Sequence, residues 1–149
     1  MDNNTSKFRK MEIRELCITD FTEYPGPRYK DQGEFSGEEF YVEILNEKFY
    51  TCYKEDCLLV IYLDGTAGYP SSFLDEAFGE LVYDFSESIV RKHLRFNTVF
   101  NKKRVEKLKA ETYPQWESRR NENENIKNTI HDKILRHIDL DGNDSYREI

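Results

Sequence analysis

Two serines and two acidic residues stand at the start of an amphipathic segment in the middle of the chain. The stretch 58–84 reads LLVIYLDGTAGYPSSFLDEAFGELVYD, so an apolar run ends in Asp-Gly, a short loop follows, and Ser71 and Ser72 open a helical pattern. This layout places hydroxyls, backbone N–H groups and carboxylates at the mouth of a strand-to-helix turn, where α/β domains bind anions and other ligands. The turn is therefore the candidate site.

The second serine has a structural explanation, whereas the first does not. Ser72 and Asp75 are spaced as a capping box, which stabilises a helix N-terminus by about 1 kcal/mol without any further function. Ser71 precedes that cap beside the rigid Pro70, and we expect its hydroxyl to face solvent. A phosphate on Ser71 would meet the positive end of the helix dipole. The carboxylates of Asp75 and Glu76 would oppose it.

Aromatic residues flank the serines and offer another use of the turn. Tyr69 and Phe73 could form an exposed patch for a protein partner, since exposed aromatic side chains concentrate binding energy. Catalysis is disfavoured, because the turn holds no histidine to activate Ser71 and lacks the G-x-S-x-G elbow. The residues Gly65–Gly68 also lack the lysine of a phosphate-binding loop. We expect no catalytic residues, no cofactor and no enzymatic activity.

Basic residues supply two further candidate anion sites. Arg28 lies between prolines in an extended loop, and either belongs to a recognition surface or pairs with a carboxylate. The segment 91–109 holds eight Lys or Arg and one acidic residue, although the whole chain has a net charge of −7. It predicts either a solvated helix face or a phosphate-binding surface. Its candidate anion ligands are Lys102, Lys103, Arg104 and Lys107.

Composition restricts the function classes. The net negative charge argues against general nucleic-acid binding. Three cysteines without CxxC spacing and three histidines without ligand spacing predict no metal site. The Asp-rich segment 139–144 resembles a calcium loop, but Asp144 occupies the position of the turn glycine, so calcium is rejected. No apolar run approaches a membrane span, and we expect a cytoplasmic protein.

The elements that position the turn follow from periodicity and caps. The order strand–helix–strand–helix–strand–helix predicts an α/β sandwich with a mixed or parallel sheet and helices packed on it. The run 57–63 is continuously apolar, as expected of a central strand covered on both faces. Ser36 starts a helix through a capping box with Glu39, and Gly79 suggests a close backbone contact. The predicted strands are 11–21, 57–63 and 94–100, and the predicted helices are 36–49, 72–84 and 102–116.

The ends of the chain differ from this pattern. Residues 1–10 are polar and predicted to be flexible, and residues 11–116 form the predicted domain. The polar linker that follows leads to Ile126, Ile130, Ile134 and Ile138, whose spacing of four predicts a C-terminal helix with a narrow apolar strip. The segment 117–149 is therefore assigned to a linker and a helical tail.

Two blocks of sequence resemble a known family. The blocks are PGPRYKDQGEFSGEEF and GYPSSFLDEAFGELV. Over about 24–101 the chain resembles the STAS-like domain of unknown function, a prokaryotic family distantly akin to anti-sigma-factor antagonists. The resemblance implies a small α/β sandwich and partner switching, in which a kinase-like ATPase phosphorylates a serine at a helix start. Ser71 matches the modified position, with Pro70 and Phe73 replacing the acidic residue and glycine of the motif.

The resemblance and the residues together lead to one main hypothesis. We expect a regulatory module that binds another protein through the turn, with a kinase-like ATPase or a transcription or defence regulator as the partner that the resemblance implies. The partner-binding residues would be Arg28, Tyr69, Ser71, Ser72, Phe73, Asp75 and Glu76. The alternative is a small-anion or nucleotide sensor that uses the same turn together with Arg28 or the basic helix.

Overall fold

A three-stranded parallel sheet supports the fold. The computed structural model describes residues 11–149, and the predicted flexible segment 1–10 lies outside the described residues. The strands are β1 (Ile13–Cys17), β2 (Leu58–Tyr62) and β3 (Leu94–Asn97), in the order β1-β2-β3 with every pairing parallel. The predicted α/β class, with a parallel sheet and helices packed on it, is confirmed.

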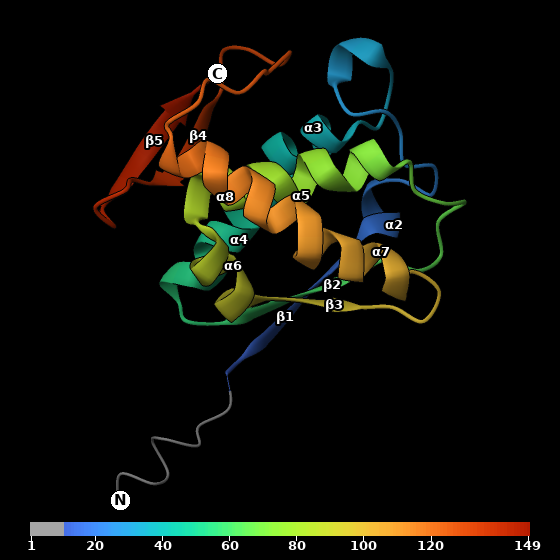
Figure 1. The fold of residues 1–149 in the computed structure, drawn as a ribbon. Helices are drawn as coiled ribbons and strands as arrows, with labels where there is room; N and C mark the ends of the chain where they lie inside the picture. Colours follow the sequence, from blue (N-terminus) through green and yellow to red (C-terminus); the bar gives the residue numbers. More distant parts are fainter. Residues whose placement is uncertain (1–10) are drawn as a thin grey trace, which may run out of the picture.

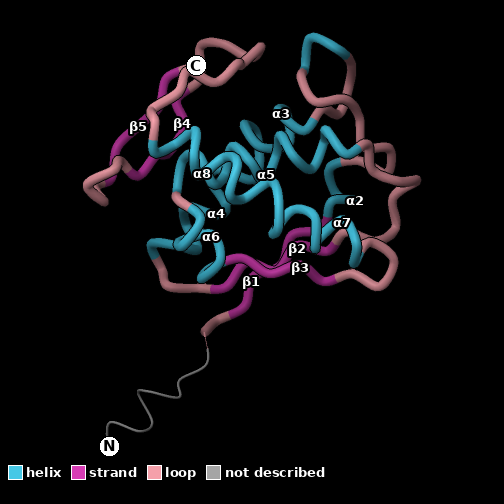
Figure 2. Tube along the Cα trace, in the orientation of Figure 1, coloured by secondary structure: helices cyan, strands magenta, loops and turns pink. Residues whose placement is uncertain are grey.

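The helices gather on one side of this sheet, as Figures 1 and 2 show. The expectation that β2 is covered on both faces is therefore wrong for the described residues. Two helical segments contain a π-helical turn, at Tyr41–Leu45 between α3 and α4 and at Leu108–Thr112 between α7 and α8. The helices are α2 (Ile18–Phe21), α3 (Gly37–Phe40), α4 (Asn46–Lys54), α5 (Ser71–Phe85), α6 (Glu87–His93), α7 (Lys102–Lys107) and α8 (Tyr113–Asn121), with a 3-10 turn at Lys30–Gln32.

Side-chain caps define two of the helix starts. Ser36 Oγ accepts a hydrogen bond from the backbone N–H of Glu39 at 3.0 Å, as predicted for the helix that follows. Ser86 separates α5 from α6 with φ of 83° and accepts from the N–H of Ile89 at 3.3 Å. Both caps satisfy an otherwise unpaired N–H group in the first turn.

The central helix α5 is buried on almost every side. It packs against α8, α3, α6 and the C-terminal strands, and its apolar residues form the centre of the core. Gly79 faces α8, where an added Cβ would lie 2.2 Å from Cε2 of Trp116. The predicted close contact at Gly79 is confirmed, because a larger residue would overlap with the indole ring.

The C-terminal segment forms a β-hairpin instead of the predicted helix. Its strands are β4 (Ile134–Ile138) and β5 (Asp144–Glu148), which pair antiparallel, while α8 runs on to Asn121 across the predicted linker boundary. A spacing of four residues is even and therefore also fits the two-residue period of a strand. The extended form is favoured by tertiary contacts, since Asn46 accepts from the backbone N–H of Arg136 at 2.9 Å and donates to its carbonyl at 3.1 Å.

Candidate functional site

The loop after β2 holds the candidate turn in a fixed position. The hydroxyl of Tyr69 donates to the carbonyl of Leu63 at 2.6 Å, and the ring of Tyr69 is buried next to Phe73. Helix α5 then begins at Ser71, with Pro70 as its N-cap residue and no side-chain cap. The buried rings of Tyr69 and Phe73 therefore fix the start of α5, where Ser71 and Ser72 lie.

The predicted capping box of Ser72 and Asp75 does not form. Asp75 instead accepts hydrogen bonds from Arg28 at 2.8 Å and from Thr112 at 2.9 Å. A more distant bond, at 3.4 Å, comes from the indole N–H of Trp116. Because the carboxylate of Asp75 binds distant segments, it forms no local cap. Asp75 instead joins the loop that holds Arg28 to the turn between α7 and α8.

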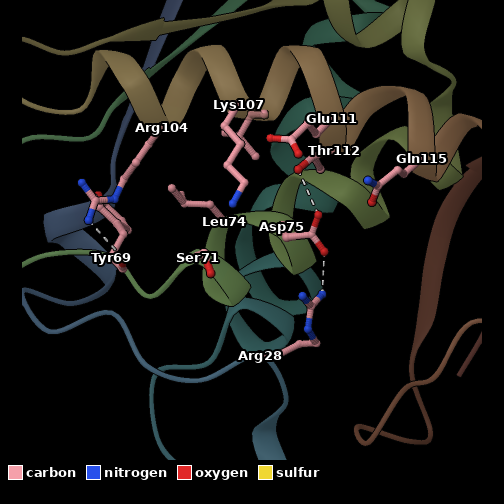
Figure 3. A pocket seen from close by; sticks show the side chains of 11 residues that line it. Arg28, Tyr69, Ser71, Leu74, Asp75, Arg104, Lys107, Glu111, Thr112 and Gln115 are labelled. Carbon is pink, nitrogen blue, oxygen red and sulfur yellow. Dashed lines mark hydrogen bonds and ion pairs between the residues drawn. The ribbon is translucent and has the colours of Figure 1, made fainter.

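A cavity of about 660 Å³ opens between the start of α5 and the α7–α8 segment. Ser71 is exposed at its edge, and Figure 3 shows Lys107 reaching into it near Leu74. Arg104 lies beside Tyr69 and Gln115 lies at the opposite end. The cavity combines a helix N-terminus with cationic side chains, which is an arrangement suited to anions. Its lining residues are Arg28, Tyr69, Ser71, Leu74, Asp75, Arg104, Lys107, Leu108, Glu111, Thr112 and Gln115.

Two of the basic lining residues are available to a ligand. Arg104 makes only long contacts, at 3.3 Å to Asn101 and 3.5 Å to the carbonyl of Tyr69. Lys107 is exposed and forms no ion pair within residues 11–149. Arg28 is different, because its guanidinium already donates to the carboxyl groups of Asp75 at 2.8 Å and Glu76 at 3.2 Å. The two alternatives for Arg28 are thus resolved in favour of pairing with carboxylates.

The structure separates the predicted partner-binding residues into two groups. Ser71 is exposed and Ser72 is half-buried, but Tyr69, Phe73 and Glu76 are buried. The prediction that Tyr69, Phe73 and Glu76 form a partner-binding surface is therefore wrong, because their side chains fill the core. Aromatic residues next to a helix start pack inward here, since the loop from β2 turns back over the sheet.

The basic cluster predicted on the last helix is divided as well. Arg104 and Lys107 line the cavity beside Ser71. Lys102 and Lys103 instead line a separate groove of about 340 Å³ together with the exposed Val99 and Phe100. Arg104 borders this groove as well, so its side chain lies between the cavity and the groove.

Asp64 fixes the turn that carries this second groove. Its carboxylate accepts from the hydroxyl of Thr98 at 2.5 Å, the backbone N–H of Val99 at 2.6 Å and the amide of Asn101 at 2.9 Å. Hydrogen bonds from Thr98 and Val99 lower the pKa of Asp64 below its ordinary value. The carboxylate of Asp64 therefore serves this turn and takes no part in the cavity beside Ser71.

A row of buried acids runs along α5 and was not predicted as a feature. Glu76, Glu80 and Asp84 are four residues apart and fully buried. One carboxylate oxygen of Glu76 and one of Glu80 lack a hydrogen-bond partner within residues 11–149. Burial, and next the neighbouring Glu80 carboxyl, raises the pKa of Glu76 to about 10. Arg28, which donates to Glu76 at 3.2 Å, opposes this shift.

Asp84, at the other end of the row, is ionised by contacts with the C-terminal hairpin. Burial opposes its charge, but Arg147, with two bonds of 2.8 Å, and His137, at 2.7 Å, hold the pKa of Asp84 below its ordinary value. The hydroxyl of Tyr41 also donates to it. Arg147 donates further to Glu80 at 2.8 Å and so bridges two acids of the row.

The described residues offer no arrangement for a resident metal ion. No group of three or more His, Cys, Asp or Glu among residues 11–149 is placed to hold one. The Asp-rich segment is the turn of the β4–β5 hairpin, where Asp139 accepts from the N–H groups of Asp141 and Asn143. Within the same residues, none of the helices has the length and apolar character that a membrane crossing needs.

Comparison with known proteins gives one match. The family model of the STAS-like domain of unknown function matches residues 36–101, which run from the cap of α3 through β2 and α5 to the turn after β3. The resemblance expected from the sequence is confirmed over this region. No curated protein and no solved structure matches the chain. The matched region contains Ser71, but Arg104 and Lys107 lie beyond it.

Proposed function

We propose that this STAS-like domain is a non-enzymatic regulatory module that binds a small phosphorylated ligand of the nucleotide class. The observation that carries this proposal is the cavity of about 660 Å³ at the N-terminus of α5. Its volume lies within the range of small-molecule sites, roughly 300–1,000 Å³. Arg104 and Lys107 supply positive charge for the phosphates. Ser71 supplies a hydroxyl, and the first turn of α5 supplies backbone N–H groups.

The shape of the site favours a small ligand over a protein partner held by aromatic anchors. The two aromatic side chains of the turn, Tyr69 and Phe73, are buried and are not accessible to a protein partner. Glu111 and Gln115 lie on the α7–α8 side of the cavity. Glu111 can accept hydrogen bonds from hydroxyl or amide groups of a ligand, and Gln115 can both accept and donate them.

Calorimetry and thermal shift with ATP, GTP, AMP and pyrophosphate test this function. Arg104→Gln and Lys107→Gln should each weaken the affinity about tenfold by removing a charge-assisted contact. Lys109→Gln is the matched control, because Lys109 is an exposed lysine of the same helical segment outside the cavity. Equal weakening by Lys109→Gln, or no stabilisation by any of the four compounds, would contradict the proposal.

A second function rests on Ser71 itself. The hydroxyl is exposed, it matches the phosphorylated position of the antagonists that the family resembles, and Lys107 lines the same cavity. A phosphate there would pair with Arg104 and Lys107 and fill the cavity from within, which would switch the surface seen by a partner. Mass spectrometry of protein from its native host should then find phosphate on Ser71. Its absence under all growth conditions would exclude the switch.

A further inference from the structure

The face of the sheet turned away from the helices is apolar at its centre. Leu58, Val60 and Tyr62 of β2 alternate with the buried Leu59 and Ile61, and all three are half-buried only. Ile13 of β1 shares their face and is 59% exposed. Parallel sheets are normally covered on both faces, and strands with continuous apolar sequence are typical of that arrangement. The sequence of β2 thus fits a strand whose second face is also covered.

Charges on this face are placed at opposite edges of one row. Glu15 of β1 is in register with Val60 of β2, and Val60 is in register with Arg95 of β3. Glu15 and Arg95 are both exposed. The hydroxyl of Tyr62 donates to Glu15 at 2.9 Å and holds its carboxylate on this face. Arg95 donates to the backbone carbonyls of Arg91 and Leu94 and to no carboxylate within residues 11–149.

We infer that two copies of this chain pack their sheets face to face, with β1 of each copy over β3 of the other. A two-fold axis along β2 produces this arrangement and places Val60 opposite its own equivalent. Glu15 of each copy then faces Arg95 of the other, so one acid–apolar–base row is complementary to itself, as an isologous interface requires. A two-fold axis across the strands would instead oppose Glu15 to Glu15 and Arg95 to Arg95.

The size of the face sets the expected strength. The longer strands, β1 and β2, have five residues and rise about 17 Å, and three strands span about 14 Å, so the sheet face covers at most on the order of 240 Å². Stable interfaces bury about 800 Å² on each partner. Side chains and loops at the rim therefore add to the contact, and the dimer is weak and dependent on concentration. The proposal is independent of the anion cavity, which lies on the helical side.

Sedimentation velocity on the full chain over a wide concentration range tests the interface. Wild type should change from monomer to dimer, and Val60→Lys should remain monomeric because it places two charges on the axis. Val99→Lys is the matched control, since it makes the same change at an exposed valine outside the sheet. Circular dichroism on both variants shows whether they fold.

A charge exchange identifies the geometry. Glu15→Arg alone should weaken the dimer, because it opposes two pairs of like charges, and the double variant Glu15→Arg with Arg95→Glu should restore it. Both positions are exposed, and circular dichroism shows whether these variants fold as well. A wild type that is monomeric at all concentrations would overturn the inference. A dimer that survives Val60→Lys, or a double variant no tighter than Glu15→Arg, would do so as well.

Discussion

Replacing Glu76 by glutamine should remove a pH dependence from the stability of this domain. Burial and the neighbouring Glu80 raise the pKa of Glu76 in the folded protein to about 10, whereas its ordinary value is 4.5. Between these values the folded state binds a proton that the unfolded chain has released. The stabilisation that goes with this proton is complete below pH 4.5 and is lost as the pH rises towards 10. Each pH unit in this window costs about 1.4 kcal/mol of unfolding free energy at this one site.

Glutamine imitates the protonated acid without titrating. Its carbonyl can accept from Arg28 as Glu76 does at 3.2 Å, and its amide can donate to the carboxylate oxygen of Glu80 that lacks a partner within residues 11–149. The variant should therefore keep the hydrogen bonds of the neutral form. The unfolding free energy of Glu76→Gln minus that of wild type should rise by up to about 1.4 kcal/mol for each pH unit.

Urea unfolding at several pH values between about 5 and 8 measures this difference directly. Acids such as Glu38 and Asp84, whose pKa values are lowered, lose stability at low pH in both proteins and cancel in the comparison. Glu106→Gln is the control, because Glu106 is exposed on α7 and should give no slope. A difference between Glu76→Gln and wild type that stays constant with pH would refute the reasoning, since Glu76 would then be ionised in the core.

Three further changes test the packing around the site. Gly79→Ala should lower the unfolding free energy by about 1–3 kcal/mol in urea unfolding, because the new Cβ overlaps with Trp116; unchanged stability would show that α8 can shift. Arg147→Met should cost about 3–5 kcal/mol in the same assay by leaving Asp84 buried without its cation; a smaller loss would mean that Asp84 takes up a proton. Asp64→Ala should speed amide hydrogen exchange in the turn 98–101, whose N–H groups lose their acceptor; unchanged exchange would contradict this role.

The sequence predicted the parts of the fold that depend on local patterns. Apolar runs and caps located the three strands and the main helices, because burial of a strand or a helix stripe leaves a regular period in the sequence. The cap at Ser36 was found from its spacing to Glu39, and Gly79 was singled out as a glycine inside a helical pattern. Both signals are local in the sequence, although the contact that Gly79 makes is with Trp116 on α8.

The strand-to-helix turn was predicted from the sequence, but the directions of its side chains were not. The turn lies between β2 and α5, and Ser71, Arg104 and Lys107 line one cavity. The directions of Tyr69 and Phe73 could not be read from spacing, because an aromatic residue before or after a helix start can face either the core or solvent. The predicted cap by Ser72 failed for a related reason, since Asp75 binds Arg28 and Thr112 from distant segments.

The two largest omissions, the C-terminal hairpin and the acid row, have one physical cause. Glu76, Glu80 and Asp84 are spaced like a solvated helix face, and such a stripe is buried only where cations and donors cover it. Here Glu80 and Asp84 are covered by Arg147 on β5 and His137 on β4, more than fifty residues away, whereas Glu76 is covered by Arg28. The hairpin places Arg147 and His137 against Glu80 and Asp84 of α5. These contacts favour strands over the helix that the sequence predicted for the C-terminal segment. Burial of Glu80 and Asp84 depends on the hairpin, and the hairpin is held by contacts with the same two acids. Local sequence patterns therefore predict neither the hairpin nor the burial of these acids.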